Sequence, residues 1–320
     1  MIAGHITTDF THLARVVKHN GEIHFYNEEQ IKNEPKLYLE TILQRYLRKQ
    51  EELPESACFA VRSTVHNNSA RGVLLPWPID SNELSKILSF SKVQLVNEYH
   101  ATAKGLLGLK PELLFTINKG IPDPKGIKGL IVIDDQFGET FIVNEGGDYR
   151  SYVTEAGHSG FAPASQLETE LWHYLYVENR FVEIGHILSR SGLPTIYEFL
   201  TEHHGTPQAS WYTESEYACS SIMEMALSEK DEIAVEALDI LIDCIASEAA
   251  NLALRGVTSG GIYLAGNLST ELTTALDRGF FMERFAHRGE VKDFLSRVPV
   301  QVVMESQTTL LGAASFALGI

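Results

Sequence analysis

The sequence predicts an α/β fold made of two domains with a cleft between them. Short apolar strand patterns alternate with longer segments of helical periodicity, which is typical of mixed α/β proteins. A strand-rich stretch followed by helices occurs twice along the chain. The length of 320 residues allows two domains of moderate size, and the hydrophobic share of 44% is enough for each to bury a core.

The first half is predicted to be strand-rich. Apolar runs and period-two patterns predict strands over residues 1–6, 11–17, 22–26, 57–61 and 93–96. Apolar residues at helical spacing predict helices over 37–49, from Ser81 or Asn82 to Leu88, and over 99–107, with Ser81 or Asn82 as the cap of the second helix.

The second half repeats this order with more helices. Strands are predicted over 113–118, 130–133, 140–143, 261–264 and 300–304, and the segment 119–129 is a loop rich in Gly, Pro and Lys. Helices are predicted over 167–179, 182–188, 195–203, 215–227, 232–255, 272–284 and 309–318.

Charge and composition exclude several classes of function. The net charge of −16 argues against a nucleic-acid partner and against anionic membranes. No apolar run is long enough to span a bilayer, and the first residues lack the pattern of a secretory signal, so we expect a cytoplasmic protein. The three cysteines lie far apart and are expected to be buried reduced thiols.

Five segments, taken in order, resemble segments of the bacterial glucokinases, which are sugar kinases of the actin-like ATPase (ribonuclease H-like) fold. The segments are Val-Asn-Glu-Tyr-His-Ala-Thr-Ala at 96–103, Glu-Ala-Gly-His-Ser-Gly-Phe-Ala-Pro at 155–163, Ile-Leu-Ser-Arg-Ser-Gly-Leu at 187–193, Ser-Gly-Gly-Ile-Tyr-Leu-Ala-Gly-Asn at 259–267 and Leu-Leu-Gly-Ala-Ala at 310–314. The resemblance spans almost the whole chain. It implies a small α/β domain, 1–108, completed by a C-terminal helix in 303–320, and a large domain, 109–302.

The same resemblance implies ATP and Mg²⁺ as cofactors, a hexose such as glucose as the small-molecule ligand, and a homodimer. Asn97 and Glu98 match a pair that contacts the sugar and supplies the catalytic base, although the family has Asp where this chain has Glu98. A carboxylate at a helix start, favourable to the helix dipole, is the alternative role of Glu98. An added methylene displaces the carboxylate, and a shift of about 1 Å can cost about a hundredfold in rate.

Glu155 and His158 match the sugar-binding Glu and His of the family, and both types of side chain can hydrogen-bond ring hydroxyls. The alternative is an ordinary polar turn. A further Glu of the family aligns with Gly185, which has no side chain, while Glu183 lies two residues earlier and is expected on another face of a helix. The sugar pocket is therefore predicted to be retained in part.

The nucleotide segments depart most from the family. Gly4 and Thr8 lie in the first phosphate segment, where His5 replaces a metal-organising Asp and threonines replace turn glycines. Only Gly138 remains of the second, whose neighbours Asp134, Asp135 and Glu139 are expected to face the phosphates and repel them.

The third nucleotide segment is retained. Gly260, Gly261 and Gly266 match a segment that contacts adenosine in the family, and close packing of helix and strand is the alternative reason for these glycines. His5, Asp9 and His12 need not converge on a strand–turn–strand, so no metal site is predicted.

The sequence therefore predicts a glucokinase-like protein with absent or very weak phosphoryl transfer and a sugar-binding or regulatory role. The alternative is an active ATP-dependent glucokinase or hexokinase that uses Glu98 as its base.

Overall fold

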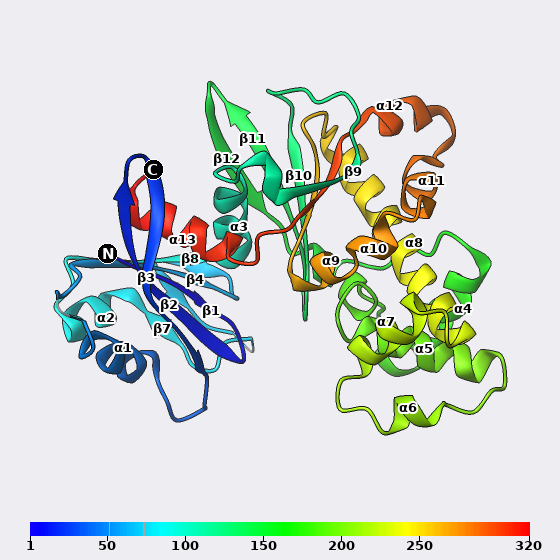
Figure 1. Cartoon of the computed structure of the whole chain (residues 1–320), viewed down its shortest axis with the longest axis horizontal. Helices are drawn as coiled ribbons and strands as arrows, with labels where there is room; N and C mark the ends of the chain where they lie inside the picture. The colour runs from blue at the N-terminus through cyan, green and yellow to red at the C-terminus, as the bar shows by residue number, and fades with distance from the viewer. Residues whose placement is uncertain (51, 73) are drawn as a thin grey trace. The chain divides into compact units, whose positions relative to one another are not determined.

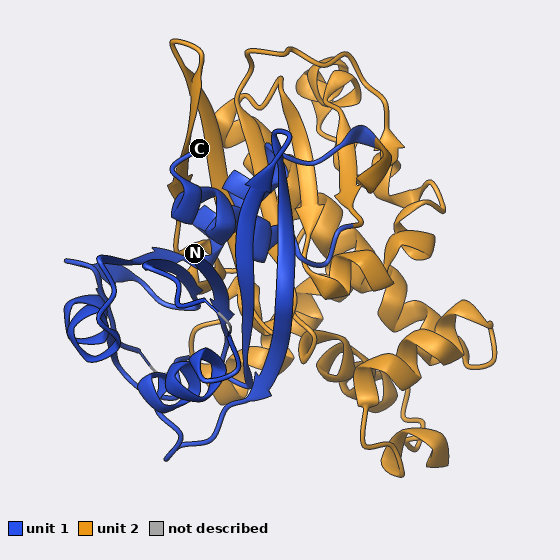
Figure 2. Cartoon of the chain, turned by 60° about the vertical axis from the view of Figure 1, so that its left-hand side comes forward, with its two compact units in different colours: residues 1–111, 305–320 blue, residues 112–304 orange. Residues whose placement is uncertain are grey.

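The computed structural model describes residues 1–50, 52–72 and 74–320, which form two compact units (Figures 1 and 2). Unit 1 consists of residues 1–111 and 305–320, and unit 2 of residues 112–304. The boundaries expected from the sequence, after residues 108 and 302, lie close to these.

Unit 1 contains four α-helices and eight strands in its described residues. They are β1 (Ile2–Ile6), β2 (Phe10–His19), β3 (Glu22–Lys32), α1 (Leu39–Leu47), β4 (Ser56–Val61), β5 (Val65–His66), β6 (Ser69–Ala70), β7 (Ile79–Asp80), α2 (Ser81–Leu88), β8 (Lys92–Asn97) and α3 (Glu98–Leu106), with a fourth helix, α13 (Thr308–Leu318), from the C-terminal segment. The main sheet has the order β3-β2-β1-β4-β8, and β1, β4 and β8 run parallel. The carboxyl ends of these three strands therefore meet at one edge.

The two faces of this sheet bury different residues because side chains alternate along a strand. Large residues such as Ile2 and Phe59 face α1 and α2, whereas small ones such as Ala3 and Ala60 face α13. The small residues let α13 lie close to the sheet and to α3. A Cβ added at Gly312 would lie 1.7 Å from the carbonyl oxygen of Ala101, so this helix crossing requires glycine.

Unit 2 contains a second sheet of the same design. Its elements are β9 (Leu114–Asn118), β10 (Lys128–Ile133), β11 (Phe137–Glu145), β12 (Asp148–Val153), α4 (Gln166–Asn179), α5 (Gly192–His203), α6 (Ser210–Thr213), α7 (Ala218–Leu227), α8 (Glu232–Gly256), β13 (Gly261–Ala265), α9 (Asn267–Glu271), α10 (Thr273–Leu276), α11 (Phe280–Ala286), α12 (Lys292–Arg297) and β14 (Val300–Val303). Short 3₁₀ turns cover Pro111–Leu113, which joins the units, and Ala156–His158, Ile184–His186 and Gly289–Val291.

The order β12-β11-β10-β13-β14-β9 repeats the unit 1 arrangement of an antiparallel meander followed by parallel strands, with β9 added at one edge. Helix α8 packs on β10 and β13 and against α5, α7 and α11. Its buried face, with residues such as Leu241 and Ile245, forms the centre of the unit 2 core. The predicted repetition of a strand-rich stretch followed by helices is thus confirmed.

Three local predictions were wrong. Asp80 caps α2, accepting from the N–H groups of Asn82 and Glu83 at 2.8 and 3.2 Å, so the cap precedes the predicted Ser81 or Asn82. The helix expected over 272–284 is divided into α10 and α11 because Gly279 has a φ of 90°. The segment 182–188 contains only one 3₁₀ turn.

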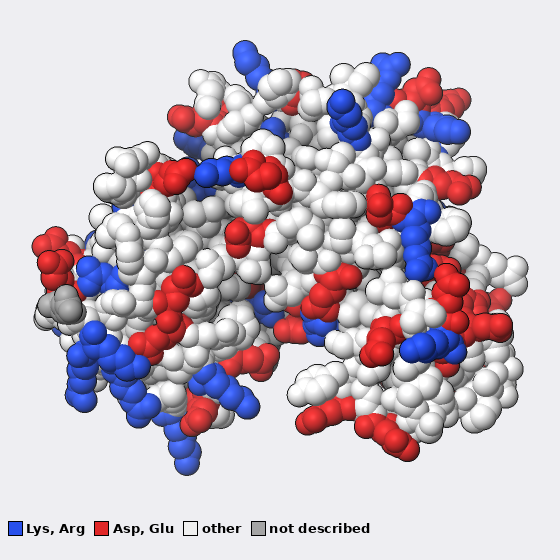
Figure 3. Space-filling view, in the orientation of Figure 1, with Lys and Arg blue, Asp and Glu red and all other residues white. Residues whose placement is uncertain are grey.

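The acidic excess lies in unit 2. Unit 1 holds 13 Lys and Arg and 13 Asp and Glu, whereas unit 2 holds 13 and 29, which accounts for the whole net charge of −16. On the face drawn in Figure 3, Lys and Arg side chains gather over the α1 part of unit 1. Arguments from net charge about partners therefore apply to unit 2 rather than to unit 1.

Candidate functional site

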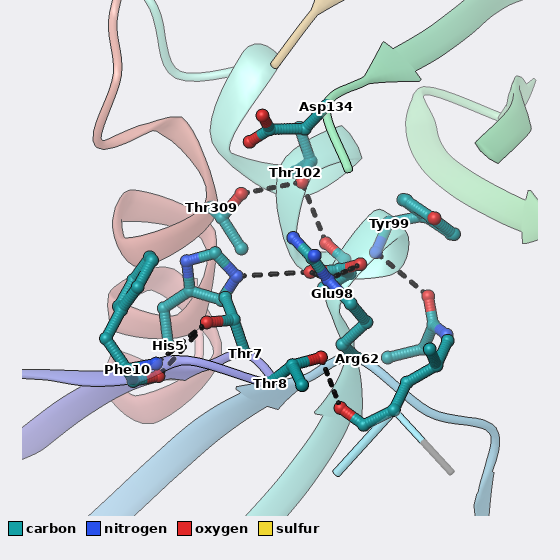
Figure 4. Close-up of polar contacts among 12 residues, drawn as sticks. His5, Thr7, Thr8, Phe10, Arg62, Glu98, Tyr99, Thr102, Asp134 and Thr309 are labelled. Atoms are coloured by element: carbon teal, nitrogen blue, oxygen red, sulfur yellow. Dashed lines mark hydrogen bonds and ion pairs between the residues drawn. The ribbon is translucent and has the colours of Figure 1, made fainter. Parts of the chain in front are cut away.

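Glu98 lies at the centre of a buried polar cluster in unit 1 (Figure 4). It is the first residue of α3, directly after β8, and is only 4% exposed. Arg62 follows the end of β4 and donates from Nε to both carboxylate oxygens of Glu98, at 2.9 and 3.1 Å. His5 of β1 places its Nε2 3.2 Å from Glu98 Oε2. Because β1, β4 and β8 are parallel neighbours, their carboxyl ends bring these three side chains together.

The charge state of Glu98 follows from these contacts. Burial is the largest influence and opposes ionisation, but the hydrogen bond from His5 and the charge of Arg62 together outweigh it and lower the pKa of Glu98. The carboxylate is therefore ionised, with both oxygens engaged. A general base with a lowered pKa has a reduced tendency to accept a proton.

Asn97 mainly serves the start of α3. Its Oδ1 accepts from the N–H groups of Tyr99 and His100 at 2.9 and 3.4 Å, and its Nδ2 donates to the carbonyl of Ser63 at 3.1 Å. Asn97 is thus a helix cap that also fixes the segment after β4. One N–H of its amide is not used in these contacts and could serve a ligand.

Hydrogen bonds within unit 1 hold the turn between β1 and β2. Thr7 N–H and Oγ1 both bind the carbonyl of Phe10, and Thr8 Oγ1 donates to the carbonyl of Leu74 at 2.9 Å. Asn33 Nδ2 donates to the Thr7 carbonyl at 2.9 Å. None of residues 7–9 has a positive φ, the conformation that helps successive N–H groups surround an anion. This turn does not fit a phosphate-binding loop.

Gly4 lies inside β1 rather than in the turn. A Cβ at this position would be 2.5 Å from the ring of Phe59, so core packing alone requires the glycine. Gly4 thus packs against Phe59, and the Thr8 hydroxyl is hydrogen-bonded to Leu74, so both predicted nucleotide-binding residues have contacts inside unit 1.

The described residues also do not fit a Mg²⁺ site. Magnesium prefers oxygen ligands, but His5 takes the place of an acidic ligand and is already paired with Glu98. His12 pairs instead with Glu28, at 3.1 Å. Among the residues that the structure describes, no group of three His, Cys, Asp or Glu side chains is arranged to hold a metal ion.

In unit 2, an arginine occupies the carboxyl edge of β10 and β13. Arg190 forms two hydrogen bonds with Glu271, at 2.7 and 3.1 Å, and lies 3.5 Å from Asp134 and 3.9 Å from Asp135. The backbone N–H of Arg190 donates to the Asp134 carbonyl at 2.8 Å. The two aspartates are therefore paired with an internal cation, and the cluster still carries more negative than positive charge, which disfavours an anionic ligand.

Glu139 does not belong to this edge, contrary to the sequence-based expectation. It is 2% exposed and faces α8, where Arg255 lies 3.6 Å from Glu139 and 2.6 Å from Glu248. Burial first, and then the carboxylate of Glu248, raise the pKa of Glu139 to about 8. Side chains alternate along β11, so Glu139 points into the unit 2 packing. Gly138 precedes it in β11, paired with Val132.

The three later glycines are not brought together. Gly260 directly precedes β13, and Gly261 is the first residue of that strand. A Cβ at Gly260 would lie 2.5 Å from the carbonyl oxygen of Gly126. Gly266 follows the other end of β13 with a φ of 95°, and its Cβ would lie 2.3 Å from the carbonyl oxygen of Ile133. Only Gly266 lies at the carboxyl edge, where ligands bind in open α/β sheets.

Glu155 directly precedes the 3₁₀ turn 156–158 in unit 2 and His158 is the last residue of that turn, and both are exposed. A third side chain joins them, because Glu183 Oε2 lies 2.8 Å from His158 Nδ1. Glu183 was expected on another face of a helix, but the residue lies in extended backbone before the 3₁₀ turn 184–186. The structure thus brings Glu183 to the candidate sugar-binding residues.

Sequence reasoning missed Arg62, Glu183 and Arg190 as site residues. Arg190 could have been found as a cation where the family turn has glycine, and Arg62 as a charge directly after the apolar run 57–61. No pattern in the sequence indicates that Glu183 lies beside His158, because the two residues belong to segments 25 residues apart.

No helix in the described part of the chain is long and apolar enough to cross a membrane.

Comparison with known proteins agrees with this architecture. The glucokinase family model matches residues 2–319. A glucokinase from Nostoc sp. (strain PCC 7120) is 28% identical, covering 98% of this chain and 97% of its own length. A glucokinase from Synechocystis sp. (strain PCC 6803) is 30% identical over 81% of this chain and 78% of its own length.

Solved structures show the same fold. A glucokinase from an Antarctic psychrotroph superposes with a TM-score of 0.84 at 20% identity, covering 100% of this chain and 98% of its own. The Balamuthia mandrillaris glucokinase in complex with glucose superposes with a TM-score of 0.83 at 15% identity, covering 99% of this chain and 93% of its own. The fold is thus the actin-like ATPase fold of sugar kinases. With the family model matching nearly every residue, the chain belongs to the glucokinase family.

Proposed function

We propose that this member of the glucokinase family binds a hexose, and that its phosphoryl transfer from ATP to the sugar is absent or very slow. Its role would then be sugar binding or regulation. The observation that carries this proposal is the pairing of Glu98 with Arg62 and His5. Glu98 is the residue that matches the family's catalytic base in sequence. A base must accept the proton of the sugar hydroxyl, and this carboxylate is already occupied by two internal donors.

The nucleotide segments support the same proposal. Both threonine hydroxyls and the Thr7 N–H of the turn at residues 7–9 are engaged within unit 1, and Arg190 is hydrogen-bonded to Glu271. Loss of one well-placed donor to a developing charge typically costs roughly 2.7–4 kcal/mol of transition-state stabilisation. Several such losses would reduce turnover far below that of an ordinary kinase, while leaving a polar surface at Glu155 and His158 for hydroxyl groups.

An active ATP-dependent glucokinase is the second candidate, and the relatives favour it because those compared are glucokinases. In that case Glu98 acts as the base after Arg62 or His5 moves away. The homodimer and the cytoplasmic location stay predictions.

One experiment separates the two candidates. Glucose binding is measured by titration calorimetry, and glucose 6-phosphate formation by a coupled assay with Mg-ATP, for the wild type and Glu98→Gln. Glucose binding with equally low turnover in both proteins is the expected result. Turnover that Glu98→Gln abolishes would establish the active enzyme instead.

A further inference from the structure

His158 and Glu183 form a pair that the backbone holds in place. The 2.8 Å contact between His158 Nδ1 and Glu183 Oε2 joins segments 25 residues apart. Beside it, the N–H of Phe161 donates to the carbonyl of Val182 and the N–H of Ile184 donates to the carbonyl of Ser159, each at 2.9 Å. Gly160 and Glu183 form an antiparallel bridge between these two hydrogen bonds. The two side chains therefore face each other because their main chains are paired.

The surrounding backbone explains why the carboxylate comes from position 183. A Cβ at Gly157 would lie 2.5 Å from the carbonyl oxygen of Phe137, so the turn is pressed against β11. A Cβ at Gly185 would in turn lie 3.1 Å from the carbonyl oxygen of Gly157. This stacking leaves little room for a side chain at 185. Glu183, whose side chain is 29% exposed, instead contacts His158 from the backbone segment that pairs with Gly160.

The contact determines how the imidazole is protonated. A carboxylate only accepts hydrogen bonds, so the nitrogen facing it, Nδ1, must carry the proton. In the neutral ring Nε2 is then left as an acceptor. The side chain of His158 is 63% exposed, which leaves this edge open to a ligand. A partner carboxylate that orients a functional imidazole in this way is a recurring arrangement in protein sites.

We propose that Glu183 is a positioning residue for ligand recognition in unit 2. It holds His158 in the Nδ1–H tautomer, so that Nε2 accepts a hydrogen bond from a hydroxyl group of the ligand. Glu155, on the other side of the same turn, accepts from a second hydroxyl. The ligand class is a neutral polyol with neighbouring hydroxyls, such as an unmodified hexose. This inference rests on the proposed hexose binding and adds a residue and a tautomer to it.

The test combines NMR with calorimetry. Long-range ¹H–¹⁵N spectra report the tautomer of His158, assigned with His158→Gln, and calorimetry reports glucose affinity. The wild type is expected to show the Nδ1–H form. Glu183→Ala should lose the preference for this form and weaken glucose binding about tenfold, as expected for loss of a hydrogen bond to a charged group. Glu183→Gln keeps an acceptor oxygen and should retain both the tautomer and most of the affinity.

Glu178→Ala is the matched control, because it removes the same charge from the exposed end of α4 and should change neither readout. An unchanged tautomer and unchanged glucose affinity in Glu183→Ala would overturn the inference. If the wild type binds no glucose, the proposed function and the ligand part of the inference both fail. The NMR experiment still shows whether Glu183 sets the tautomer, so the two failures can be told apart.

Discussion

The Nε–H of Arg62 is shared between both carboxylate oxygens of Glu98, at 2.9 and 3.1 Å, in a part of unit 1 where both residues are at least nine-tenths buried. Two opposite charges at this depth are stable only as a pair, because each alone would lose its hydration without compensation. His5 adds a third polar contact to the same carboxylate. The pairing links the fold of unit 1 directly to the chemistry expected of Glu98.

Removal of one partner should therefore be costly. Arg62→Ala leaves the Glu98 carboxylate buried beside His5 alone, and we expect the free energy of unfolding to fall by about 3–5 kcal/mol. The double substitution Arg62→Met with Glu98→Met removes both charges and should cost less than Arg62→Ala. Urea denaturation followed by circular dichroism measures both. A loss below about 1 kcal/mol in Arg62→Ala would mean that the pair is not held in the folded protein.

Glu139 should make stability depend on pH. Its folded-state pKa of about 8 lies above the ordinary value of 4.5, so the folded protein binds more protons than the unfolded chain between these values. Stability from this group is therefore complete below pH 4.5 and is lost as the pH rises toward 8. Glu139→Gln should raise the free energy of unfolding at pH 8.5 by roughly 1–3 kcal/mol and flatten its dependence on pH.

Glu145 provides the control for this experiment. It is at the exposed end of the same strand, β11, and Glu145→Gln should change the free energy of unfolding at pH 8.5 by less than about 0.5 kcal/mol. Chemical denaturation from pH 5 to pH 9 gives both profiles. A parallel profile for Glu139→Gln and the wild type would show that the buried carboxyl does not titrate in this range.

Val257 should be a source of backbone strain. It ends α8 with φ 47° and ψ 53°, a left-handed conformation that a β-branched residue rarely adopts, and it is 62% exposed. Val257→Gly should therefore stabilise the protein by about 1 kcal/mol. Val291→Gly is the matched control, since Val291 has a φ of −93° and should lose stability on the same change. If both variants unfold at a lower temperature than the wild type, the backbone of Val257 is not strained.

The contact between α3 and α13 should not tolerate a methyl group. Gly312→Ala would place a Cβ 1.7 Å from the Ala101 carbonyl oxygen, and we expect a loss of about 1–3 kcal/mol or more in unfolding free energy. At Gly108 a Cβ would meet its nearest neighbour at an ordinary 3.5 Å, so Gly108→Ala should stay within about 0.5 kcal/mol of the wild type. Equal stability of the two variants would show that the helices can separate at no cost.

Elements with a strong local pattern could be predicted well from the sequence. The helix expected over 232–255 is α8, Glu232–Gly256, because its period of 3.6 residues runs without interruption. The strand Asp148–Val153 was missed, since its exposed polar residues resemble a loop and only pairing with β11 defines it. Gly279 divided a predicted helix because a single positive φ is not visible in apolar spacing.

The candidate site shows the same division. Contiguous motifs in the sequence are enough to select the candidate residues Asn97, Glu98, Glu155 and His158. Their partners Arg62 and Glu183 come from separate segments, and only strand order or backbone pairing brings them close. Only the register of β11 could have predicted that the Glu139 side chain points into the interior of unit 2.

With Glu98 held by Arg62 and His5, the protein is expected to transfer little or no phosphate to a sugar. The most direct measurement is a single-turnover reaction of γ-labelled ATP with glucose and excess protein in the presence of Mg²⁺. We predict no labelled hexose phosphate above the level given by Glu98→Gln. Formation of labelled product at about 1 s⁻¹ or faster, within the ordinary range of enzymes, and its loss in Glu98→Gln, would contradict the account.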